Sequence, residues 1–318
     1  MKNEVKTLSD AIRYFADEQV CIDTVAAMRW PNGPVCPACE SGELRQHWLK
    51  NQKRWQCREC GKQYSVKVNT IFEDSAIRLD KWLTAMWMLA NCKNGVSSYE
   101  IARSVGVTQK SAWFMLHRIR EAMKNKSLRK LGGDGGPVEV DETYIGGKIK
   151  NMHAKKRLTL NQGRSDRKAT VMGLLERNTR EIRTKVIPNV SREVLQGEIL
   201  KQVSPLGTVY TDGFPSYDDL KVKNFVHETV NHMNEYVRGE VHTQGIENFW
   251  SMFKRSLNGT YVAVEPFHLD RYADEQAFRY NNCKGKNDAD RFKLALSQVS
   301  GKRLTYAELT GKVGETPF

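Results

Sequence analysis

Two pairs of closely spaced cysteines constrain the N-terminal part of this chain more than any other feature of its sequence. Cys36 and Cys39 form one C-x-x-C pair, and Cys57 and Cys60 form a second pair after seventeen intervening residues. Each pair can place two thiolates on one ion, and two pairs complete a tetrahedral site. The spacing therefore predicts a zinc ribbon over residues 35–68, in which Zn²⁺ is structural. The alternative is a chance pairing of reduced thiols or a redox-active C-x-x-C motif, but a redox motif would not need the second pair.

The charge of the chain indicates a polyanionic partner. Its 50 Lys and Arg residues outnumber its 37 Asp and Glu residues, which gives a net charge of +13. Nucleic acid or an anionic membrane surface would suit this excess. The membrane is the weaker candidate, because the longest apolar run, residues 82–90, is far too short to span a bilayer.

We expect the protein to be located in the cytoplasm and associated with the nucleoid. The first residues, MKNEVKTLSDAIRYF, mix both charge signs and lack the apolar run of a signal peptide. The cysteines outside the two pairs, Cys21, Cys92 and Cys283, stand apart from one another. Isolated thiols in an odd total make a poor disulfide framework.

The segments of the chain predict a multidomain α+β protein. A glycine-rich stretch, LGGDGGP, is the clearest linker, and strands alternate with helices after it. The strands are expected over 138–148, in a hairpin over 169–188 that turns near Asn178, and over 207–214 and 224–230. The predicted division is an N-terminal helical segment over 1–34, the zinc ribbon over 35–68, a helical domain over 78–125, the linker over 131–137, an α/β domain over 138–283 and a C-terminal tail over 284–318.

Residues 97–123 have the pattern of a helix–turn–helix DNA-binding domain. Ser97 and Glu100 predict a capping box at the start of the first helix. Gly106 can end that helix, and Thr108 can cap the second one. In such motifs the start of the second helix meets base edges, while basic residues beside it meet phosphates. An ordinary helical hairpin with a solvated basic face is the alternative.

The candidate DNA contacts of this segment fall on the second helix. They are the polar residues at its start and one stripe along it. The set comprises Gln109, Lys110, Ser111, Trp113, His117, Arg120 and Lys124.

Three acidic residues in the later part of the chain stand where local preference does not explain them. Asp141 lies in the middle of a predicted strand, on the face opposite Val138 and Val140, although Asp is disfavoured in strands. Asp212 ends another strand, where it could simply begin a turn. Glu247 lies on the rim of an amphipathic helix, two turns before Lys254, where a solvated ion pair is the plain alternative. Together the three carboxylates suit a two-metal site for phosphoryl transfer.

Several long motifs in the same order resemble a known family. The chain is similar to bacterial insertion-sequence transposases of the zinc-ribbon, ISXO-two-like DDE type, over most of its length. The motifs are RWPNGPVCPAC, WQCRECGKQYSVKVNTIFEDS, SAWFMLHRIREAM, VEVDETYIGGK, VYTDGFPSY and IENFWSMFKRSLNGTY. One departure is Cys283 in FRYNNCK, where a basic residue is expected; it puts a C-terminal contact in doubt.

This resemblance implies a fold, a site and an activity. The α/β domain would be a ribonuclease-H-like catalytic domain in which Asp141, Asp212 and Glu247 hold two Mg²⁺ or Mn²⁺ ions, with Lys254 near the transposon end. The implied enzyme is a DNA transposase that binds the ends of its insertion sequence, releases 3′-hydroxyls and joins them to target DNA. Its partners would be double-stranded DNA, as terminal inverted repeats and as target, and further copies of itself in a homodimer or larger oligomer.

A basic loop follows the first of these strands. Residues 148–168 carry eight Lys or Arg residues against one Asp. The loop is expected to grip DNA near the cut, and a solvated disordered loop is the alternative. The candidate contacts of this group are Lys148, Lys150, Lys155, Lys156 and Arg157, together with Arg255 on the later helix.

Two other functions use the same motifs. One is a catalytically inactive DNA-binding regulator derived from a transposase, although the three acids and Lys254 are intact. The other is a nuclease of the same fold that cuts without joining. Strand joining that depends on Mg²⁺ separates the transposase from both.

Overall fold

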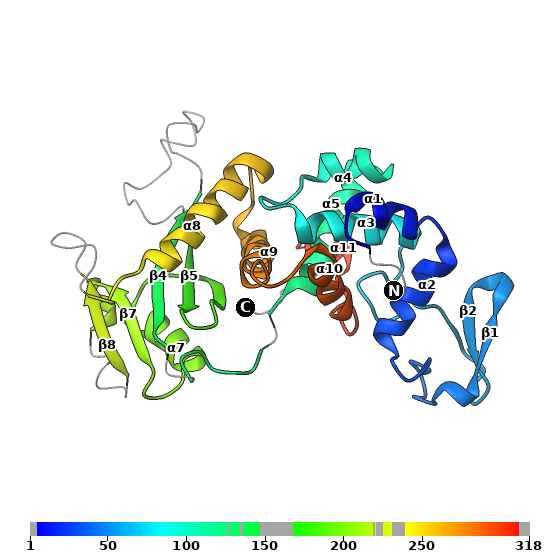
Figure 1. Ribbon diagram of the computed structural model, residues 1–318, viewed down its shortest axis with the longest axis horizontal. Helices are drawn as coiled ribbons and strands as arrows, with labels where there is room; N and C mark the ends of the chain where they lie inside the picture. The colour runs from blue at the N-terminus through cyan, green and yellow to red at the C-terminus, as the bar shows by residue number, and fades with distance from the viewer. Residues whose placement is uncertain are drawn as a thin grey trace. The chain divides into compact units, whose positions relative to one another are not determined.

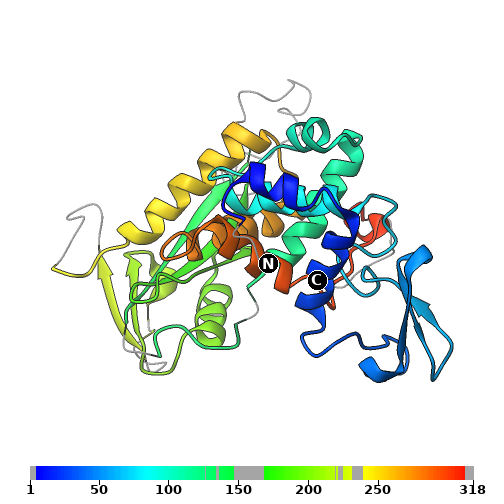
Figure 2. The same cartoon turned by 45° about the vertical axis from the view of Figure 1, so that its right-hand side comes forward.

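The computed structural model describes residues 5–125, 127–133, 136–146, 168–218, 220, 225–230 and 239–311. The chain forms two compact units, which are coloured by residue number in Figures 1 and 2. The first unit comprises Met1–Lys124 and Asn282–Phe318, and the second comprises Asn125–Asn281. None of the helices in these described ranges is both long and apolar enough to cross a membrane.

A small antiparallel sheet carries the two cysteine pairs of the first unit. Its strands are β1 (Gln46–Leu49), β2 (Arg54–Cys57) and β3 (Gln63–Tyr64), in the order β1-β2-β3. The 3₁₀ turns Glu43–Arg45 and Lys50–Gln52 flank β1. Trp55 lies between Trp30 and Trp48, with ring centroids 5.2 and 4.5 Å away, and stacks on Tyr64 at 6.1 Å. These aromatic rings therefore form the core of the small sheet.

The rest of the first unit is helical, and α3 lies at its centre. The helices are α1 (Leu8–Tyr14), α2 (Glu18–Arg29), α3 (Leu79–Asn91), α4 (Ser98–Val105), α5 (Gln109–Met123), α10 (Asp288–Ser297) and α11 (Tyr306–Leu309). α3 contacts α1, α2, α4, α5 and α10. Most of its side chains are buried, including Trp82 and Trp87. A helix with neighbours all round needs apolar residues on every face.

The ends of α4 and α5 lie where the sequence predicts them. Ser97 and Glu100 form a capping box at the start of α4. Gly106 ends that helix in the left-handed conformation, at a φ of 63°, and Thr108 accepts a hydrogen bond from the backbone N–H of Ser111 at the start of α5. A residue with a Cβ would be strained at position 106.

The described C-terminal residues, 282–311, are part of the first unit, whereas the sequence predicted a tail over 284–318. Helix α10 packs on α3, and Phe292 is fully buried between Phe15 and Trp87, with ring centroids 5.5 and 5.3 Å away. The backbone N–H of Ile71 also donates to the carbonyl of Val299, at 3.1 Å. The burial of these apolar side chains explains the difference, because they complete the core around α3.

The second unit is built on a mixed five-stranded sheet. Its strands are β4 (Val138–Ile145), β5 (Ala169–Glu176), β6 (Ile182–Ile187), β7 (Thr208–Asp212) and β8 (Val226–Val230), in the order β6-β5-β4-β7-β8. β5 is antiparallel to β4 and β6, while β7 is parallel to β4 and β8. The hairpin predicted over 169–188 is thus present as β5 and β6, with its turn around Asn178.

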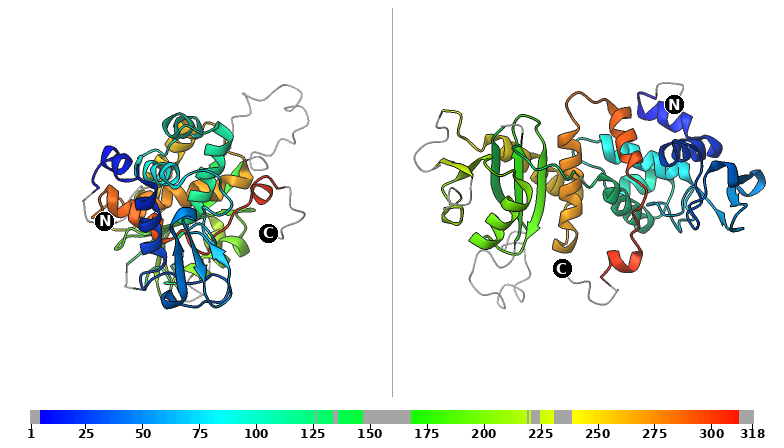
Figure 3. Two further views of the ribbon diagram at one scale, coloured as in Figure 1. Left: turned by 90° about the vertical axis from the view of Figure 1, so that its right-hand side faces the viewer. Right: turned by 90° about the horizontal axis from the view of Figure 1, so that it is seen from below.

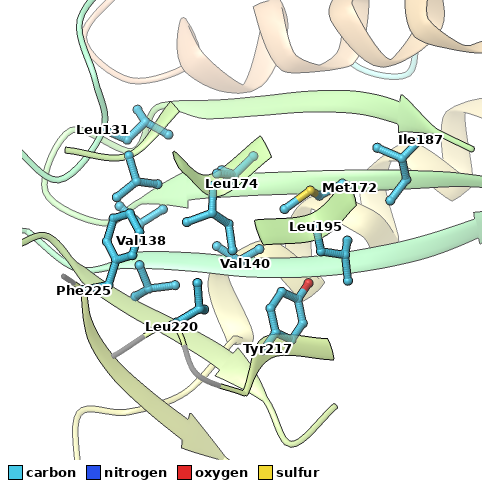
Figure 4. Packing of buried hydrophobic residues seen from close by; sticks show 13 residues of the cluster. Leu131, Val138, Val140, Met172, Leu174, Ile187, Leu195, Tyr217, Leu220 and Phe225 are labelled. Atoms are coloured by element: carbon cyan, nitrogen blue, oxygen red, sulfur yellow. The ribbon is translucent and has the colours of Figure 1, made fainter. Parts of the chain in front are cut away.

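Helices cover both faces of this sheet. α7 (Arg192–Gln202) packs on one face, where Val138, Val140 and Leu174 meet Leu195 in one buried cluster (Figure 4). α8 (Gln244–Ser256) and α9 (Leu269–Asn281) cover the other face, and α9 runs beside the strands in Figure 3. Short turns over Pro215–Tyr217, Leu257–Tyr261 and Pro266–His268 connect these elements.

The described part of the predicted linker over 131–137 is integrated into the second unit. Leu131 is fully buried and forms a parallel bridge with Val203. Before it, Arg129 forms an ion pair of 2.6 Å with the buried Glu176. The glycines that suggested a linker instead let the backbone pass close to the sheet, because Gly132 has a φ of 76° and its ideal Cβ would lie 3.3 Å from Val138. Along the chain, the boundaries between the two units therefore fall at residues 124/125 and 281/282 rather than within 131–137.

Candidate metal centres and nucleic-acid surface

The four paired cysteines come together, as the sequence predicts. Their sulfur atoms all lie within 4.8 Å of one another. Cys36 Sγ is 3.7 Å from Cys60 Sγ, and Cys39 Sγ is 3.6 Å from Cys57 Sγ. A tetrahedral zinc ion with Zn–S bonds of about 2.3 Å holds its sulfurs about 3.8 Å apart. The residues therefore fit a structural Zn²⁺ site that is closed by four thiolates.

Ser41 supports this cluster, although it lies outside the C-x-x-C motifs from which the site was predicted. Its hydroxyl oxygen lies 3.0 Å from Cys57 Sγ and 3.2 Å from Cys39 Sγ. The hydrogen bond from Ser41 is the main cause that lowers the pKa of Cys57 to about 6. A lowered pKa favours the thiolate, which is the form that binds metal.

Asp141 and Asp212 lie on one face of the large sheet, at neighbouring strands. Asp141 Oδ2 accepts a hydrogen bond of 3.0 Å from Trp250 Nε1, so it faces α8. β4 and β7 are in parallel register, with Glu139 opposite Tyr210. Two residues further along each strand, Asp141 and Asp212 are therefore level and point to the same side. Asp212 is the last residue of β7.

Glu247 belongs to the first turn of α8, on the same side of the sheet. Its side chain is exposed, and its Oε1 accepts a hydrogen bond of 3.0 Å from Thr243 Oγ1. The helix approaches the sheet closely because Gly173 of β5 has no side chain. A Cβ there would lie 2.7 Å from Trp250 Cζ2, which real Cβ contacts do not show. The helix is amphipathic as expected, and its buried face comprises Ile246, Phe249, Trp250, Phe253 and Leu257.

The three carboxylates share one electrostatic environment. Burial is the main cause that raises the pKa of Asp141 to about 6, and the negative charges of Asp212 and Glu247 contribute to the same shift. Their oxygens are not as close as the cysteine sulfurs, since among the described residues the cysteine quartet alone has its ligand atoms within 4.8 Å. Carboxylate oxygens are hard donors that suit Mg²⁺ or Mn²⁺. A divalent cation would offset the mutual repulsion of these negative charges.

A fourth acid, Glu142, lies behind the three. It follows Asp141 on β4 and faces the α7 side, where Tyr217 donates its hydroxyl hydrogen to Glu142 Oε1. Burial, followed by the charges of Asp141 and Asp212, raises the pKa of Glu142 to about 7. The adjacent pair of acids in VEVDETY is the signal for Glu142 in the sequence, but strand alternation places Glu142 on the opposite face from Asp141 and so did not predict it as part of the site.

The basic residues of α8 are open to solvent. Lys254 and Arg255 are both exposed, and Lys254 lies seven residues after Glu247 on the same helix. The basic loop residues Lys148, Lys150, Lys155, Lys156 and Arg157 lie outside the described residues.

The stripe expected along α5 is only partly at the surface. His117 and Arg120 are 0% and 1% exposed, so the expectation of an open stripe through them is wrong. The physical reason is that α5 packs against α3, α4 and α10, which buries more than the one face that helical periodicity assumes.

The remaining candidates on α5 keep some exposure. Lys110 is exposed and places its Nζ over the ring of Tyr306, 4.7 Å from the centroid. Gln109, Ser111 and Trp113 are half-buried, and Gln109 Nε2 donates to Ser98 Oγ at 2.8 Å. Lys124 forms an ion pair of 2.8 Å with Glu121. The start of α5 is thus the accessible part of the set.

The sequence matches family models in both units. Residues 132–281 match the ISXO2-like transposase domain, and residues 16–63 match the transposase zinc-ribbon domain. A Halobacterium salinarum protein described as an uncharacterized protein in transposable element ISH50 is 29% identical over 260 residues, which cover 78% of this chain and 85% of the relative. An uncharacterized transposase-like protein of Haemophilus influenzae is 36% identical over 107 residues, which cover 34% of this chain and 86% of the relative.

A solved structure is also similar in part. It is the simian T-cell lymphotropic virus intasome in complex with PP2A regulatory subunit B56 gamma. The match has 11% sequence identity and a TM-score of 0.29, and it covers 60% of this chain and 66% of that chain.

Proposed function

The chain belongs to the ISXO2-like transposase family, and on that premise we propose that it is a DNA transposase with a DDE active site at Asp141, Asp212 and Glu247. It binds the ends of its insertion sequence, cleaves phosphodiester bonds there and joins the 3′-hydroxyl ends to target DNA. The proposal is supported chiefly by the parallel register of β4 and β7, which makes Asp141 level with Asp212 on the face of the sheet that α8 covers. The negative charges of Asp212 and Glu247, which act on Asp141, are in keeping with it.

The three carboxylates would hold two divalent ions, Mg²⁺ or Mn²⁺. When bound, such ions supply charge that activates the attacking oxygen and stabilises the leaving oxygen. The residues of the chain supply the geometry. Asp141 and Asp212 are fixed on the sheet, Trp250 holds one oxygen of Asp141, and Glu247 approaches from α8. Lys254, about two turns along the same exposed side of α8, would contact a phosphate near the end of the element.

The arrangement of the second unit supports a ribonuclease-H-like assignment. Its sheet is mixed: β5 and β6 are antiparallel on one side of β4, and β7 and β8 are parallel to β4 on the other side. Helices cover both faces of this sheet. The acids come from its central strand, from the strand beside it and from a covering helix. Three separate elements therefore contribute to one site.

DNA-end recognition is assigned to the first unit. The short turn between α4 and α5 and the accessible start of α5 support a helix–turn–helix, with Gln109, Lys110 and Ser111 nearest to base edges. The zinc ribbon would hold further basic residues against phosphates, including Lys50 and Arg58. Lys148, Lys150, Lys155, Lys156 and Arg157 remain proposed contacts near the cut.

The test is strand joining on DNA that carries the element ends. The full-length protein should cleave these ends and join them to a target plasmid with Mg²⁺, and Asp141→Asn should abolish both steps while end binding persists. Cleavage without joining would favour the nuclease, and binding without cleavage would favour the regulator. Either result would refute the proposed transposase activity.

A further inference from the structure

A buried acid precedes Asp141 on the same face of β4. Glu139 is 1% exposed. Its Oε1 accepts a hydrogen bond of 2.6 Å from Arg177 Nε, and its Oε2 accepts one of 2.8 Å from the backbone N–H of Ile246. Protein donors therefore engage both of its oxygens. Through these bonds Glu139 connects β4 to the start of α8.

Arg177 extends this contact to the chain that enters α8. Its Nη1 donates to the carbonyl of Glu240 at 2.6 Å, and its Nη2 donates to the carbonyl of His242 at 2.7 Å. Its guanidinium also lies over the ring of Tyr210, 4.8 Å from the centroid. One side chain that follows β5 thus contacts β4, β7 and the residues before the helix. The planar fork of an arginine suits this geometry, because a lysine has one point of attachment.

The first turn of α8 needs such a partner. Ile246 is the third residue of the helix, where backbone N–H groups have no acceptor within the helix. A carboxylate at this end is also favoured by the helix dipole. The approach is close, because a Cβ on Gly245 would lie 2.9 Å from Glu139 Oε2 and 2.7 Å from Leu175 Cδ2. The first turn of α8 therefore lies so close to the sheet that residue 245 has no room for a Cβ atom.

We propose that Glu139 and Arg177 are positioning residues that fix the first turn of α8 and so set where Glu247 lies for divalent-ion binding. The inference rests on the function proposed above. Glu247 directly follows Ile246, so displacement of the bound N–H moves its carboxylate away from the strand aspartates. The same displacement would disturb the hydrogen bond from Thr243 to Glu247.

Two conservative variants test the role. Glu139→Gln keeps the shape but replaces one acceptor oxygen by an NH₂ donor, which cannot accept from Arg177 or from Ile246. Arg177→Lys keeps the charge but loses the fork. The matched control is Arg183→Lys, because Arg183 forms an ion pair of 2.8 Å with Glu181 in the same sheet and is similarly half-buried. That control pair is at β6, away from the start of α8.

The readouts are Mn²⁺ binding, followed by electron paramagnetic resonance, and amide hydrogen exchange of residues 239–250, both on the full-length zinc-loaded protein. We expect Glu139→Gln and Arg177→Lys to lower Mn²⁺ affinity about tenfold, as loss of supporting partners commonly does at metal sites. Exchange over 239–250 should accelerate, while exchange over α7 stays unchanged. The Arg183→Lys control should match the wild type in both readouts.

Wild-type Mn²⁺ affinity in both variants would overturn the inference, whether or not exchange accelerates. Should both variants unfold, Gly245→Ala tests the same contact by steric displacement: reduced Mn²⁺ affinity supports it and wild-type affinity overturns it. The proposed function fails separately, if Asp141→Asn binds Mn²⁺ as tightly as the wild type.

Discussion

Trp250 Nε1 donates a hydrogen bond of 3.0 Å to Asp141 Oδ2, which links helix α8 directly to the central strand at the candidate active site. The indole is 3% exposed and packs over Gly173, where a Cβ would collide with it. The bond holds one carboxylate oxygen of Asp141 against the helix. Because the donor favours the charged form of Asp141, it opposes the effect of burial on the pKa of that group.

Replacement of Trp250 by Phe should therefore weaken metal binding more than folding. The ring remains, but Asp141 loses its donor and its pKa rises further above about 6. We expect Mn²⁺ affinity at pH 7 to fall about tenfold. Trp82→Phe is the control, because Trp82 Nε1 donates to Ser75 Oγ at 3.1 Å in the other unit. Equal Mn²⁺ affinities for the two variants would contradict the role given to Trp250.

The metal-free protein should lose stability as the pH rises through the acidic range. Burial raises the pKa of Asp141 to about 6 and that of Glu142 to about 7. The folded protein then binds their protons more tightly than the unfolded chain, whose carboxyl pKa values lie near 4. The free energy of unfolding consequently falls between about pH 4 and pH 7 and levels off above.

Thermal melting with and without Mg²⁺ measures this effect. At pH 8 the ion should raise the melting temperature, and at pH 5 it should do so much less, because protons then compete with it. Asp141→Asn combined with Glu142→Gln should flatten the metal-free profile. A profile that the double variant leaves unchanged would show that these two carboxyls do not cause the pH dependence.

The zinc site should hold about one ion per chain and stabilise the ribbon rather than take part in strand transfer. Cys57→Ser removes a ligand that is fully buried, so the three-stranded sheet should unfold and end binding should weaken. Cys283→Ser is the control, because Cys283 is exposed and lies outside the quartet. Complete zinc loss in Cys57→Ser with unchanged affinity for element ends would refute the structural role.

The first unit should need its C-terminal helix in order to bind DNA. Phe292→Ala empties a fully buried position between Phe15 and Trp87, which typically costs about 3–5 kcal/mol. We expect a lower melting temperature and weaker end binding, and the same for a chain truncated after residue 281. Phe267→Ala, at a position that is 50% exposed, is the control. A truncated chain that melts and binds ends like the wild type would contradict this.

The sequence was sufficient to predict those structural features whose geometry depends on a short motif of neighbouring residues. The cysteine spacing predicted the quartet, and Ser97 and Gly106 predicted the ends of α4, because caps and knuckles depend on adjacent residues. The direction of Asp141 followed from strand alternation. Relationships between distant segments were not predictable in this way. The bond from Trp250 to Asp141 joins residues more than a hundred positions apart.

The same limit explains the expectations that failed. His117 and Arg120 fit an open stripe when α5 is considered alone, but three packed helices bury them. Leu131, in the glycine-rich stretch, pairs with Val203 across the second unit. In both cases the residues that make the contact come from distant parts of the chain. A single sequence contains no direct record of which elements pack together.

The last prediction concerns which residue of Ile246-Glu247-Asn248 completes the proposed metal site, since an asparagine amide oxygen can also coordinate. Both side chains are exposed on α8, but the carboxylate of Glu247 is the one whose charge contributes to the raised pKa of Asp141. Successive helical residues are rotated by about 100°, so Asn248 faces elsewhere. Glu247 also lies nearly two full turns before Lys254 and shares its side of the helix.

Glu247→Gln should abolish cleavage and joining, because the substitution removes charge that helps to hold two divalent ions, and end binding should stay near normal. Asn248→Ala should retain measurable activity. The assay is cleavage and joining of element ends with Mg²⁺, with end binding measured in its absence. An active Glu247→Gln beside an inactive Asn248→Ala would move the ligand one residue along the helix. It would also remove Glu247 from the site that Glu139 and Arg177 are proposed to position.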